Sequence, residues 1–250
     1  MTAPILQTEY LRKAYGALTV TDDVSTDLKL GELHAIIGPN GAGKTSLIHQ
    51  LSGYQPSDGG RILFDGIDIT TLPMAKRVRL GIARTFQITS VLSGFSVLEN
   101  AAIAAQAGAG SSFHFLRPAD REQNLNDQAM TALETVGLAD RAKRQASNLS
   151  HGEKRQLELA IALATKPKLL LLDEPLAGTG HDESASLTAL INRLKGDFSI
   201  ILIEHDMDAV FALADRISVL VYGGIIASGD PGEVRSNPEV RKAYLGDETA

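Results

Sequence analysis

A glycine-rich loop between a buried strand and a helix constrains the fold of this chain more than any other feature of its sequence. The apolar run from Leu33 to Ile37 predicts a buried strand, and the pattern from Lys44 to Gly53 predicts a helix. Between them, residues 38–45 read Gly-Pro-Asn-Gly-Ala-Gly-Lys-Thr and complete the GxxxxGK(S/T) pattern. A strand, a glycine loop and a helix in this order begin an α/β fold.

This loop predicts a site for nucleotide phosphates. Its glycines allow consecutive backbone N–H groups to converge on phosphate oxygens, and the helix N-terminus adds a partial positive charge. Lys44 would neutralise the β- and γ-phosphates, and the Thr45 hydroxyl would be a magnesium ligand. The alternative, a glycine turn that carries a lysine by coincidence, does not explain the strand and the helix around it. The predicted phosphate-binding residues are Asn40, Gly41, Gly43, Lys44, Thr45 and Ser46.

Two further buried strands are predicted to end in polar side chains. The run from Leu169 to Leu172 precedes Asp173-Glu174-Pro175, and the run from Ser199 to Ile203 precedes Glu204-His205. Helical patterns over residues 153–164 and 183–195 alternate with these strands. The alternation predicts an α/β sheet whose strand carboxyl ends carry the functional groups, so the ligand is expected there.

Asp173 and Glu174 are predicted to have different tasks. A carboxylate that emerges from a buried strand is unfavourable unless it meets a cation, and magnesium on the nucleotide would supply one for Asp173. Because neighbouring side chains of a strand point to opposite sides, Glu174 could address a water as a general base. The structural alternative for this pair is a helix cap or a surface turn. His205, taken alone, fits a hydrogen-bonded polar residue at least as well as a catalytic one.

Ser150, Gly152 and Glu153 begin an amphipathic helix, and two interpretations of them stay open. Ser-x-x-Glu is a capping box, which alone would account for Ser150 and Glu153. A capped helix N-terminus with a glycine is also a site for an anion. Two other residues carry weaker signals: Tyr15 could stack on an adenine or simply pack, and Gln87 follows Thr85-Phe86.

A helical subdomain is predicted inside the nucleotide-binding core. Residues 89–148 show no strand pattern, and they contain an apolar stripe at helical spacing that stops at Gly137. The expected divisions are residues 1–88 for the first part of the core with an antiparallel β subdomain, 89–149 for the helical subdomain, and 150–250 for the rest of the core. The last part should end in a hairpin that turns at Gly223-Gly224, so the sheet is not purely parallel, and in a tail.

Composition excludes several classes of function. The 250 residues have a formal net charge of −6, which gives no basic footprint for nucleic acid. The chain has no cysteine, so it can hold neither a disulfide nor a thiolate zinc site, and the cytosol is the expected compartment. No apolar run approaches the roughly 18 residues of a membrane helix. Any membrane role is therefore expected to come through a partner.

Taken together and in order, these motifs resemble the ATP-binding cassette family across nearly the whole chain. The resemblance rests on Tyr15, the phosphate loop, Gln87, Leu149 to Glu153, Leu169 to Glu174, and His205. It implies a P-loop NTPase core of the RecA-like α/β class, with an antiparallel β subdomain and an inserted helical subdomain. It also implies an ATPase that uses ATP and Mg²⁺.

The resemblance implies roles for the residues whose own signals are weak. Two cassettes, identical or paralogous, would pair head to tail, so that ATP on one cassette meets Ser150, Gly152 and Glu153 of the other. Tyr15 would stack on the base. The implied catalytic residues are Glu174, His205 and Gln87, and the implied metal ligands are Thr45, Gln87 and Asp173.

Within that family the chain is similar to the cassettes of branched-chain amino acid importers. The similarity lies in Thr85-Phe86-Gln87, in Ile203 to Met207, and in the ending from Asn237 to Gly246. It implies a peripheral protein at the cytoplasmic face of the cell membrane that works with two permease subunits and, indirectly, with an extracytoplasmic solute-binding protein. The solutes would be branched-chain amino acids or related small polar molecules.

Three positions depart from the common family pattern, and two rival functions are open. His151 and Glu153 replace the commoner Gly and Gln, which preserves the cap, and Gly180 stands where many cassettes carry an aspartate. One rival is a soluble ABC ATPase without a transport role, although such proteins typically carry two cassettes or coiled-coil arms. The other is a P-loop kinase, which would not explain Ser150 or His205.

Overall fold

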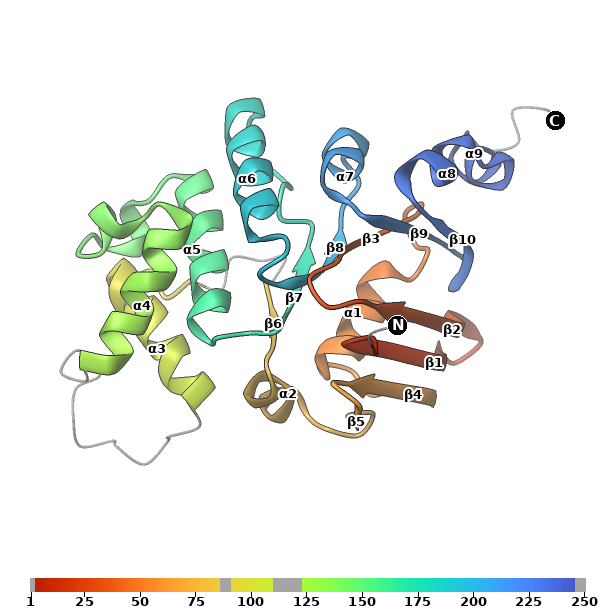
Figure 1. The fold of residues 1–250 in the computed structure, drawn as a ribbon, viewed down its shortest axis with the longest axis horizontal. Coiled ribbons are helices and arrows are strands. Elements are labelled where there is room, and N and C mark those ends of the chain that lie inside the picture. Colours follow the sequence, from red (N-terminus) through yellow and green to blue (C-terminus); the bar gives the residue numbers. More distant parts are fainter. Residues whose placement is uncertain (1–2, 86–90, 110–122, 246–250) are drawn as a thin grey trace. The chain divides into compact units, whose positions relative to one another are not determined.

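The computed structural model describes residues 3–85, 91–109 and 123–245. They form two compact units, of which the first combines residues 1–74, 171–174 and 192–250, and the second combines 75–170 and 175–191. Figure 1 shows that strands from both ends of the chain meet in the first unit, where β2 contacts β10. The first unit is therefore assembled from segments that are far apart in the sequence, whereas the two segments of the second unit are separated only by residues 171–174.

An antiparallel sheet of four strands lies in the first unit, in the order β2-β1-β4-β5. The strands are β1 (Leu6–Tyr15), β2 (Leu18–Leu28), β4 (Gly59–Phe64) and β5 (Ile67–Asp68). Leu6 pairs with Leu28 on one side and with Phe64 on the other, and all three side chains are buried. This sheet is the antiparallel β subdomain that the sequence predicts.

A second sheet has the strand order β10-β9-β3-β8-β7-β6. Every residue of β3 (Leu33–Ile37), β7 (Leu169–Asp173) and β8 (Ser199–Ile203) is buried, as in sheets that are covered on both faces. β3 runs parallel to β8 and to β9 (Arg216–Val221), whereas β9 and β10 (Gly224–Gly229) are antiparallel. The edge strand β6 spans Ile82–Arg84. The predicted α/β class with a mixed sheet is confirmed.

The hairpin of β9 and β10 turns one residue earlier than predicted. Val221 pairs with Gly224, so the turn residues are Tyr222 and Gly223 rather than Gly223 and Gly224. Tyr222 and Gly223 have φ angles of 47° and 82°. A type I′ turn requires positive φ at both central residues. Hairpins favour this turn because its twist matches that of the flanking strands. The sequence gives no signal that a tyrosine adopts the left-handed conformation, so the prediction placed the turn at the two glycines instead.

Four helices of the first unit follow its strands. α1 (Lys44–Ser52) comes after β3, α7 (Met207–Leu213) after β8, and α8 (Pro231–Ser236) and α9 (Pro238–Leu245) after β10. The prediction for α1 is confirmed except at its last residue, since Gly53 is the C-cap with φ of 73°. A glycine suits that position because the left-handed conformation is free of strain only without a Cβ.

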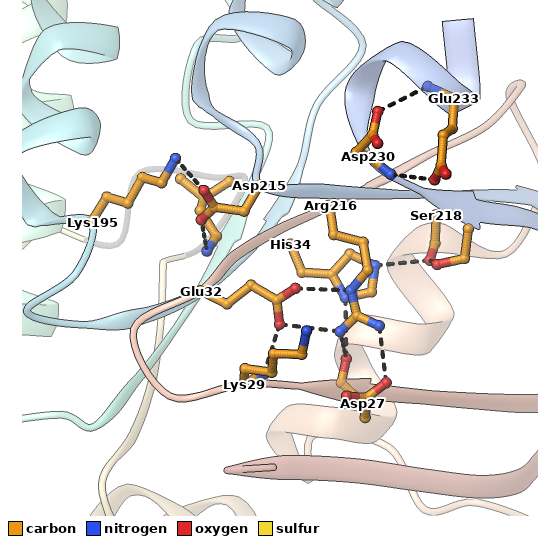
Figure 2. A network of polar contacts seen from close by, with 12 residues as sticks. Asp27, Lys29, Glu32, His34, Lys195, Asp215, Arg216, Ser218, Asp230 and Glu233 are labelled. Carbon is orange, nitrogen blue, oxygen red and sulfur yellow. Dashed lines mark hydrogen bonds and ion pairs between the residues drawn. The ribbon is translucent and has the colours of Figure 1, made fainter. Parts of the chain in front are cut away.

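Ion pairs hold β2, β3 and β9 together at the beginning of β3 (Figure 2). Arg216 of β9 donates to both oxygens of Glu32, at 2.9 and 3.1 Å, and to the Asp27 carboxylate at 2.9 Å. In the same region Lys195 Nζ lies 2.6 Å from the Asp215 carboxylate. We call Asp27, Glu32, His34 and Arg216 the amino-end network. It joins β9 to β2 and β3, from which β9 is separated by most of the chain.

His34 is the buried centre of the amino-end network. Its Nε2 lies 2.8 Å from Ser218 Oγ, and its Nδ1 lies 3.3 Å from the Asp27 carbonyl oxygen. Burial and, to a smaller extent, the charge of Arg216 lower the pKa of His34 from 6.5 to about 4. The ring is therefore neutral at pH 7, with one nitrogen as a donor and the other as an acceptor.

The second unit is largely helical. Its main helices are α3 (Val97–Ala109), α4 (Gln123–Val136) and α5 (His151–Ala164), which contact one another, together with α2 (Met74–Leu80) and most of α6 (His181–Leu194). Short 3₁₀ turns cover Ala139–Arg141 and Ala146–Asn148. The stripe predicted at helical spacing is the buried face of α4, namely Leu125, Ala129, Ala132, Leu133 and Val136. Across the described ranges, no helix is both long and apolar enough to cross a membrane.

Candidate functional site

The phosphate loop connects β3 to α1 through backbone that only glycine fits at two positions. A Cβ on Gly38 would lie 2.1 Å from the Leu220 carbonyl oxygen, and a Cβ on Gly43 would lie 2.0 Å from that of Val20. Gly43 also has a φ of 103°. Neighbouring strands thus press against the loop so closely that side chains are excluded there. The loop consequently offers its backbone to a ligand.

Lys44, the first residue of α1, turns its ammonium back over the loop. Its Nζ donates to the carbonyl oxygens of Gly38 and Pro39 at 2.7 and 3.0 Å, and the residue is only 8% exposed. Burial lowers the pKa of Lys44, while the charges of Glu174 and Asp173 act in the opposite direction. A positive charge is therefore held at the loop, within range of two carboxylates.

Asp173 and Glu174 lie where β7 ends. Asp173 is the last residue of the strand and is 2% exposed, and Glu174 follows it as a half-buried residue. Because both charges act on Lys44, the structure brings this acidic pair near the phosphate loop. The two motifs are about half the chain apart in the sequence, and the sheet unites them.

The Glu174 side chain is positioned by a different feature from the strand alternation that the sequence suggested. Alternation along a strand was expected to separate its side chain from that of Asp173, but β7 stops at Asp173. Glu174 has a φ of 48°, which is uncommon for a residue with a side chain, and its N–H donates to the Ile203 carbonyl oxygen at 2.8 Å. A tight turn tied to β8 therefore orients Glu174. Strain of this kind gathers at functional sites, where the surrounding structure maintains it.

His205 comes two residues after the end of β8, and its side chain is 66% exposed. The buried carboxylate of Glu204 accepts the His205 N–H at 3.1 Å and lies 3.7 Å from Nδ1 of the ring. Glu204 thus fixes the backbone of His205. The exposed ring remains accessible to a ligand.

Tyr15, the last residue of β1, presents a ring that is 54% exposed but held in place. Its hydroxyl donates to Gln55 Oε1 at 2.5 Å, and Lys13 Nζ lies 5.6 Å from the ring centroid. Lys13 is itself bound to the Asp58 carboxylate at 2.6 Å. A fixed, exposed aromatic ring is suited to stacking on a base. Sequence reasoning missed Gln55, since it lies 40 positions from Tyr15 and no motif contains it.

The remaining residues of the predicted phosphate site surround the loop. Asn40, Gly41 and Thr45 are exposed, and Ser46 is half-buried. A cavity of about 460 Å³ opens beside Asn40 and Gly41, and residues of α9 form part of its wall. Gln87 lies outside the described residues.

In the second unit, Ser150 caps α5 and confirms the predicted capping box. The Ser150 Oγ accepts the Glu153 N–H at 3.2 Å, and the Ser150 N–H donates to the Glu153 carboxylate at 2.9 Å. That second bond is the main reason why the pKa of Glu153 lies below its usual value, and Arg141 adds to it. The Ser150 hydroxyl uses its oxygen in the cap, so its proton can still be donated to an anion.

Gly152 contacts a residue that sequence reasoning did not identify. Its N–H donates to the Glu183 carboxylate at 3.2 Å, although 31 positions separate the two residues. A cavity of about 270 Å³ opens here, and Ser150, Gly152 and Glu153 all line it. The three residues predicted to act together therefore do share one place, at the beginning of α5.

Comparison with known proteins agrees with this geometry. The profile of the ABC transporter family matches residues 21–177, and that of the branched-chain amino acid ATP-binding cassette transporter matches residues 225–250. The chain is 39% identical to LivG of Salmonella typhimurium, a high-affinity branched-chain amino acid transport ATP-binding protein, over 99% of this chain and 100% of the relative. The chain belongs to the ABC transporter family. It is the ATP-binding cassette of the branched-chain amino acid importer group, and proteins of this kind are ATPases.

Further relatives of this cassette support the family and the fold. BraF of Pseudomonas aeruginosa, also a high-affinity branched-chain amino acid transport ATP-binding protein, is 37% identical over 99% of this chain and 100% of its own. The crystal structure of an ABC transporter cassette in its ADP conformation superposes with a TM-score of 0.88 at 33% identity, over 98% of this chain and 100% of that chain. A nucleotide-free cassette gives 0.86 at 31% identity, with the same coverage. The predicted P-loop NTPase fold is thereby confirmed.

Proposed function

We propose that this cassette binds MgATP on its phosphate loop and hydrolyses it to drive the import of amino acids through membrane permeases. The position of Lys44 carries the proposal. Its ammonium is bound by neutral carbonyl oxygens, and a phosphate would be a stronger partner because its bond to the ammonium is charge-assisted. The phosphates would then lie on the residues of the loop and of the first turn of α1, and the adenine on Tyr15. These residues are Asn40, Gly41, Gly43, Lys44, Thr45 and Ser46.

The residues present fit a magnesium ion. Mg²⁺ prefers oxygen ligands and is usually held by one or two protein groups together with phosphates and waters. The buried Asp173 carboxylate and the Thr45 hydroxyl are such groups, and Gln87 is proposed as a third. In the part of the chain that the structure describes, no group of three or more acidic or imidazole residues could hold a metal by itself. The nucleotide would therefore complete the coordination and orient its own γ-phosphate.

Glu174 is proposed as the general base. A water attacks the γ-phosphorus, the bond to the bridging oxygen of ADP breaks, and Glu174 takes the proton of the water. The turn that pins Glu174 to Ile203 fixes its backbone, and the charge of Lys44 is close by. His205 would donate to the γ-phosphate and hold the attacking water. Lys44 would offset the negative charge of the phosphates throughout.

We further propose that the site is completed by a second cassette. Ser150 and Gly152 of one chain, at the capped beginning of α5, would donate to the γ-phosphate on Lys44 of the other, and Glu153 would keep that helix end in shape. The free proton of the Ser150 hydroxyl and its exposure support this role.

Mixing two inactive variants tests the pairing. Ser150→Ala and Lys44→Ala chains should each be inactive, yet a mixed dimer contains one site whose Lys44 and Ser150 are both intact. Recovery of up to half of the wild-type activity per mixed dimer is expected in an ATPase assay. If mixed dimers form and stay inactive, the pairing in trans is wrong. A helix cap alone predicts only a loss of stability of about 0.5–2 kcal/mol for Ser150→Ala.

The similarity to LivG and BraF, and the match of residues 225–250, support import of branched-chain amino acids or related small solutes. The proposed assembly has two cassettes beneath two permease subunits at the cytoplasmic face of the membrane, and a solute-binding protein delivers the solute on the other side.

The test is co-purification with membrane permease subunits, followed by uptake of leucine into vesicles. Uptake should require ATP and should be lost in Lys44→Ala. An active ATPase that neither binds the permeases nor supports uptake would favour the soluble, non-transport class of ABC ATPase.

A further inference from the structure

The Glu183 carboxylate lies on the backbone amide that the proposed function assigns to phosphate. Its Oε1 accepts the Gly152 N–H at 3.2 Å, and its Oε2 lies 3.5 Å from the Gly180 nitrogen. A Cβ on Gly152 would be 2.8 Å from the same Oε1, so the carboxylate rests directly against this glycine. The contact joins the beginnings of α5 and α6 within the second unit.

Of the two bonds that Glu183 accepts, only the one from Gly180 is explained by helix capping. Glu183 is the third residue of α6, and a carboxylate at that position commonly returns to the amide just before the helix, here that of Gly180. Capping α6 does not require Gly152, which belongs to α5. The shorter of the two bonds is the one to Gly152. The structure therefore directs the Glu183 charge toward the candidate anion site as well as toward its own helix.

The cavity at this place has a charge that opposes a phosphate. Three of its lining residues are acidic, Glu153, Asp182 and Glu183, and none of the residues that line it is basic. The Glu153 carboxylate is engaged by Arg141 and by the Ser150 N–H. The Asp182 side chain projects fully into solvent, where its charge is screened. Glu183 is the acidic residue of the wall that accepts a bond from Gly152.

We propose that Glu183 competes with the γ-phosphate of the partner cassette's nucleotide for the Gly152 N–H, and so sets the ATP concentration at which two cassettes pair. The inference rests on the proposed function, because it needs Gly152 to bind phosphate in trans. A single N–H cannot serve a carboxylate and a phosphate oxygen fully, and two anions at this distance repel each other. Pairing therefore requires the Glu183 side chain to leave the amide, and this step weakens the apparent affinity for ATP.

Glu183→Gln tests the competition, since it keeps the shape of the side chain and removes its charge. The change is made in full-length Glu174→Gln protein, in which hydrolysis is slow and ATP-bound pairs accumulate. The ATP concentration for half-maximal pairing, measured by size-exclusion chromatography with light scattering, should fall about fivefold to tenfold. ATP binding to the single cassette should not change. In the otherwise wild-type chain, the KM for ATP should fall while kcat is maintained.

Asp182→Asn is the matched control, because it removes one charge from the same cavity wall without a bond to Gly152. It should leave the midpoint of pairing unchanged. Equal shifts in the two variants would mean a general charge effect and would overturn the proposal.

A second variant guards against a folding defect. Glu183→Asp keeps the charge at the beginning of α6 but withdraws it by one methylene from Gly152, so it should also lower the midpoint. If Glu183→Gln and Glu183→Asp are folded and their midpoints stay the same or rise, the contact is a structural cap and the proposal is wrong. If the Ser150 and Lys44 mixing experiment fails, the pairing in trans is wrong, whereas the Glu183 variants test only the competition for the Gly152 N–H. The two proposals can therefore be rejected separately.

Discussion

Charged residues lie at both ends of strand β3, but the cation at each end has partners of a different kind. At its beginning, the guanidinium of Arg216 is bound by the carboxylates of Glu32 and Asp27 (Figure 2). At its end, the ammonium of Lys44 donates to the neutral carbonyl oxygens of its own loop. The first cation is paired with anions of the chain, whereas the second is held by weaker partners that an anion can replace.

The difference separates what stabilises the fold from what serves a ligand. The amino-end network joins β2, β3 and β9, and its backbone is ordinary. The loop end contains Glu174 with a φ of 48° and glycines that no side chain could replace. Such strain persists only where the surroundings are rigid, and the buried strand between the two ends provides that rigidity. Changes at the two ends should therefore have separable effects.

The largest expected effect is a loss of turnover in Glu174→Gln, at the loop end. The amide keeps the shape of the side chain and cannot accept the proton, so kcat should fall by something like 10²–10⁴-fold. ATP and magnesium should still bind, and the thermal unfolding curve should match that of the wild-type protein. An ATPase assay at saturating ATP is the measurement. Hydrolysis at the wild-type rate would exclude Glu174 as the base and would point to His205.

At the other end of β3, Arg216→Met should lower stability rather than activity. Removing the guanidinium leaves the charge of Glu32, which is 9% exposed, without its cation, so the free energy of unfolding should fall by up to about 3–5 kcal/mol. The affinity for ATP below the unfolding temperature should be unchanged. Urea unfolding and calorimetric ATP titration measure the two quantities.

Lys195→Met is the control for Arg216→Met. It breaks the pair with Asp215 at the same end of the sheet, but both partners are partly exposed to solvent, so a loss of about 0–1 kcal/mol is expected. A change in ATP affinity in Arg216→Met, or equal losses of stability in the two variants, would contradict the separation of the two ends.

The pH dependence of stability should report on His34. Its pKa is about 4 in the folded protein, against an ordinary value of 6.5 for a solvated histidine, so between these values the unfolded chain binds a proton that the folded chain does not. The free energy of unfolding should therefore fall as the pH drops from about 6.5 to about 4, by roughly 3 kcal/mol from this group. Above pH 6.5 the ring is neutral in both states and contributes no slope.

A His34→Gln variant isolates this contribution, because carboxylates titrate in the same range. Urea unfolding at a series of pH values should show a shallower decline in the variant than in the wild-type protein. Parallel curves for the two proteins would show that His34 is not buried in the neutral form.

A smaller effect than those of Glu174 and Arg216 is expected for Tyr15, which is proposed to contact only the base. Tyr15→Ala should raise the KM for ATP by roughly five- to 150-fold, since stacking on a base contributes about 1–3 kcal/mol, while kcat is maintained. Tyr15→Phe keeps the ring and loses only the bond to Gln55, so its effect should be smaller. A loss of stability with an unchanged KM would mean that Tyr15 packs rather than stacks.

The parts of this molecule that a local pattern determines were predictable from the sequence. The apolar runs of β3 and β8 gave both strands with their bounds, the Ser-x-x-Glu spacing gave the cap of α5, and the helical pattern gave α1 to within one residue of its end. For the two strands and the cap, the pattern is itself the physical cause, whether burial on both faces of a sheet or reciprocal hydrogen bonds.

What sequence reasoning missed depends on contacts between distant segments. The turn at Tyr222, the direction of Glu174, and the anchor of Tyr15 on Gln55 each arise where one segment presses on another. The same holds for Glu183 on Gly152 and for Arg216 on Glu32. None of these pairs has a fixed spacing, so no motif could reveal it.

Equilibrium binding of ATP to Lys44→Ala shows whether the nucleotide lies on the ammonium that the loop carbonyls hold. Isothermal calorimetry with Mg²⁺ should show an affinity about tenfold to 100-fold weaker than that of the wild-type protein, since a charged hydrogen-bond partner of the phosphates is lost. Circular dichroism and thermal unfolding should be unchanged, because Lys44 lies outside the amino-end network. An unchanged affinity in folded Lys44→Ala protein would mean that the nucleotide does not bind at this ammonium.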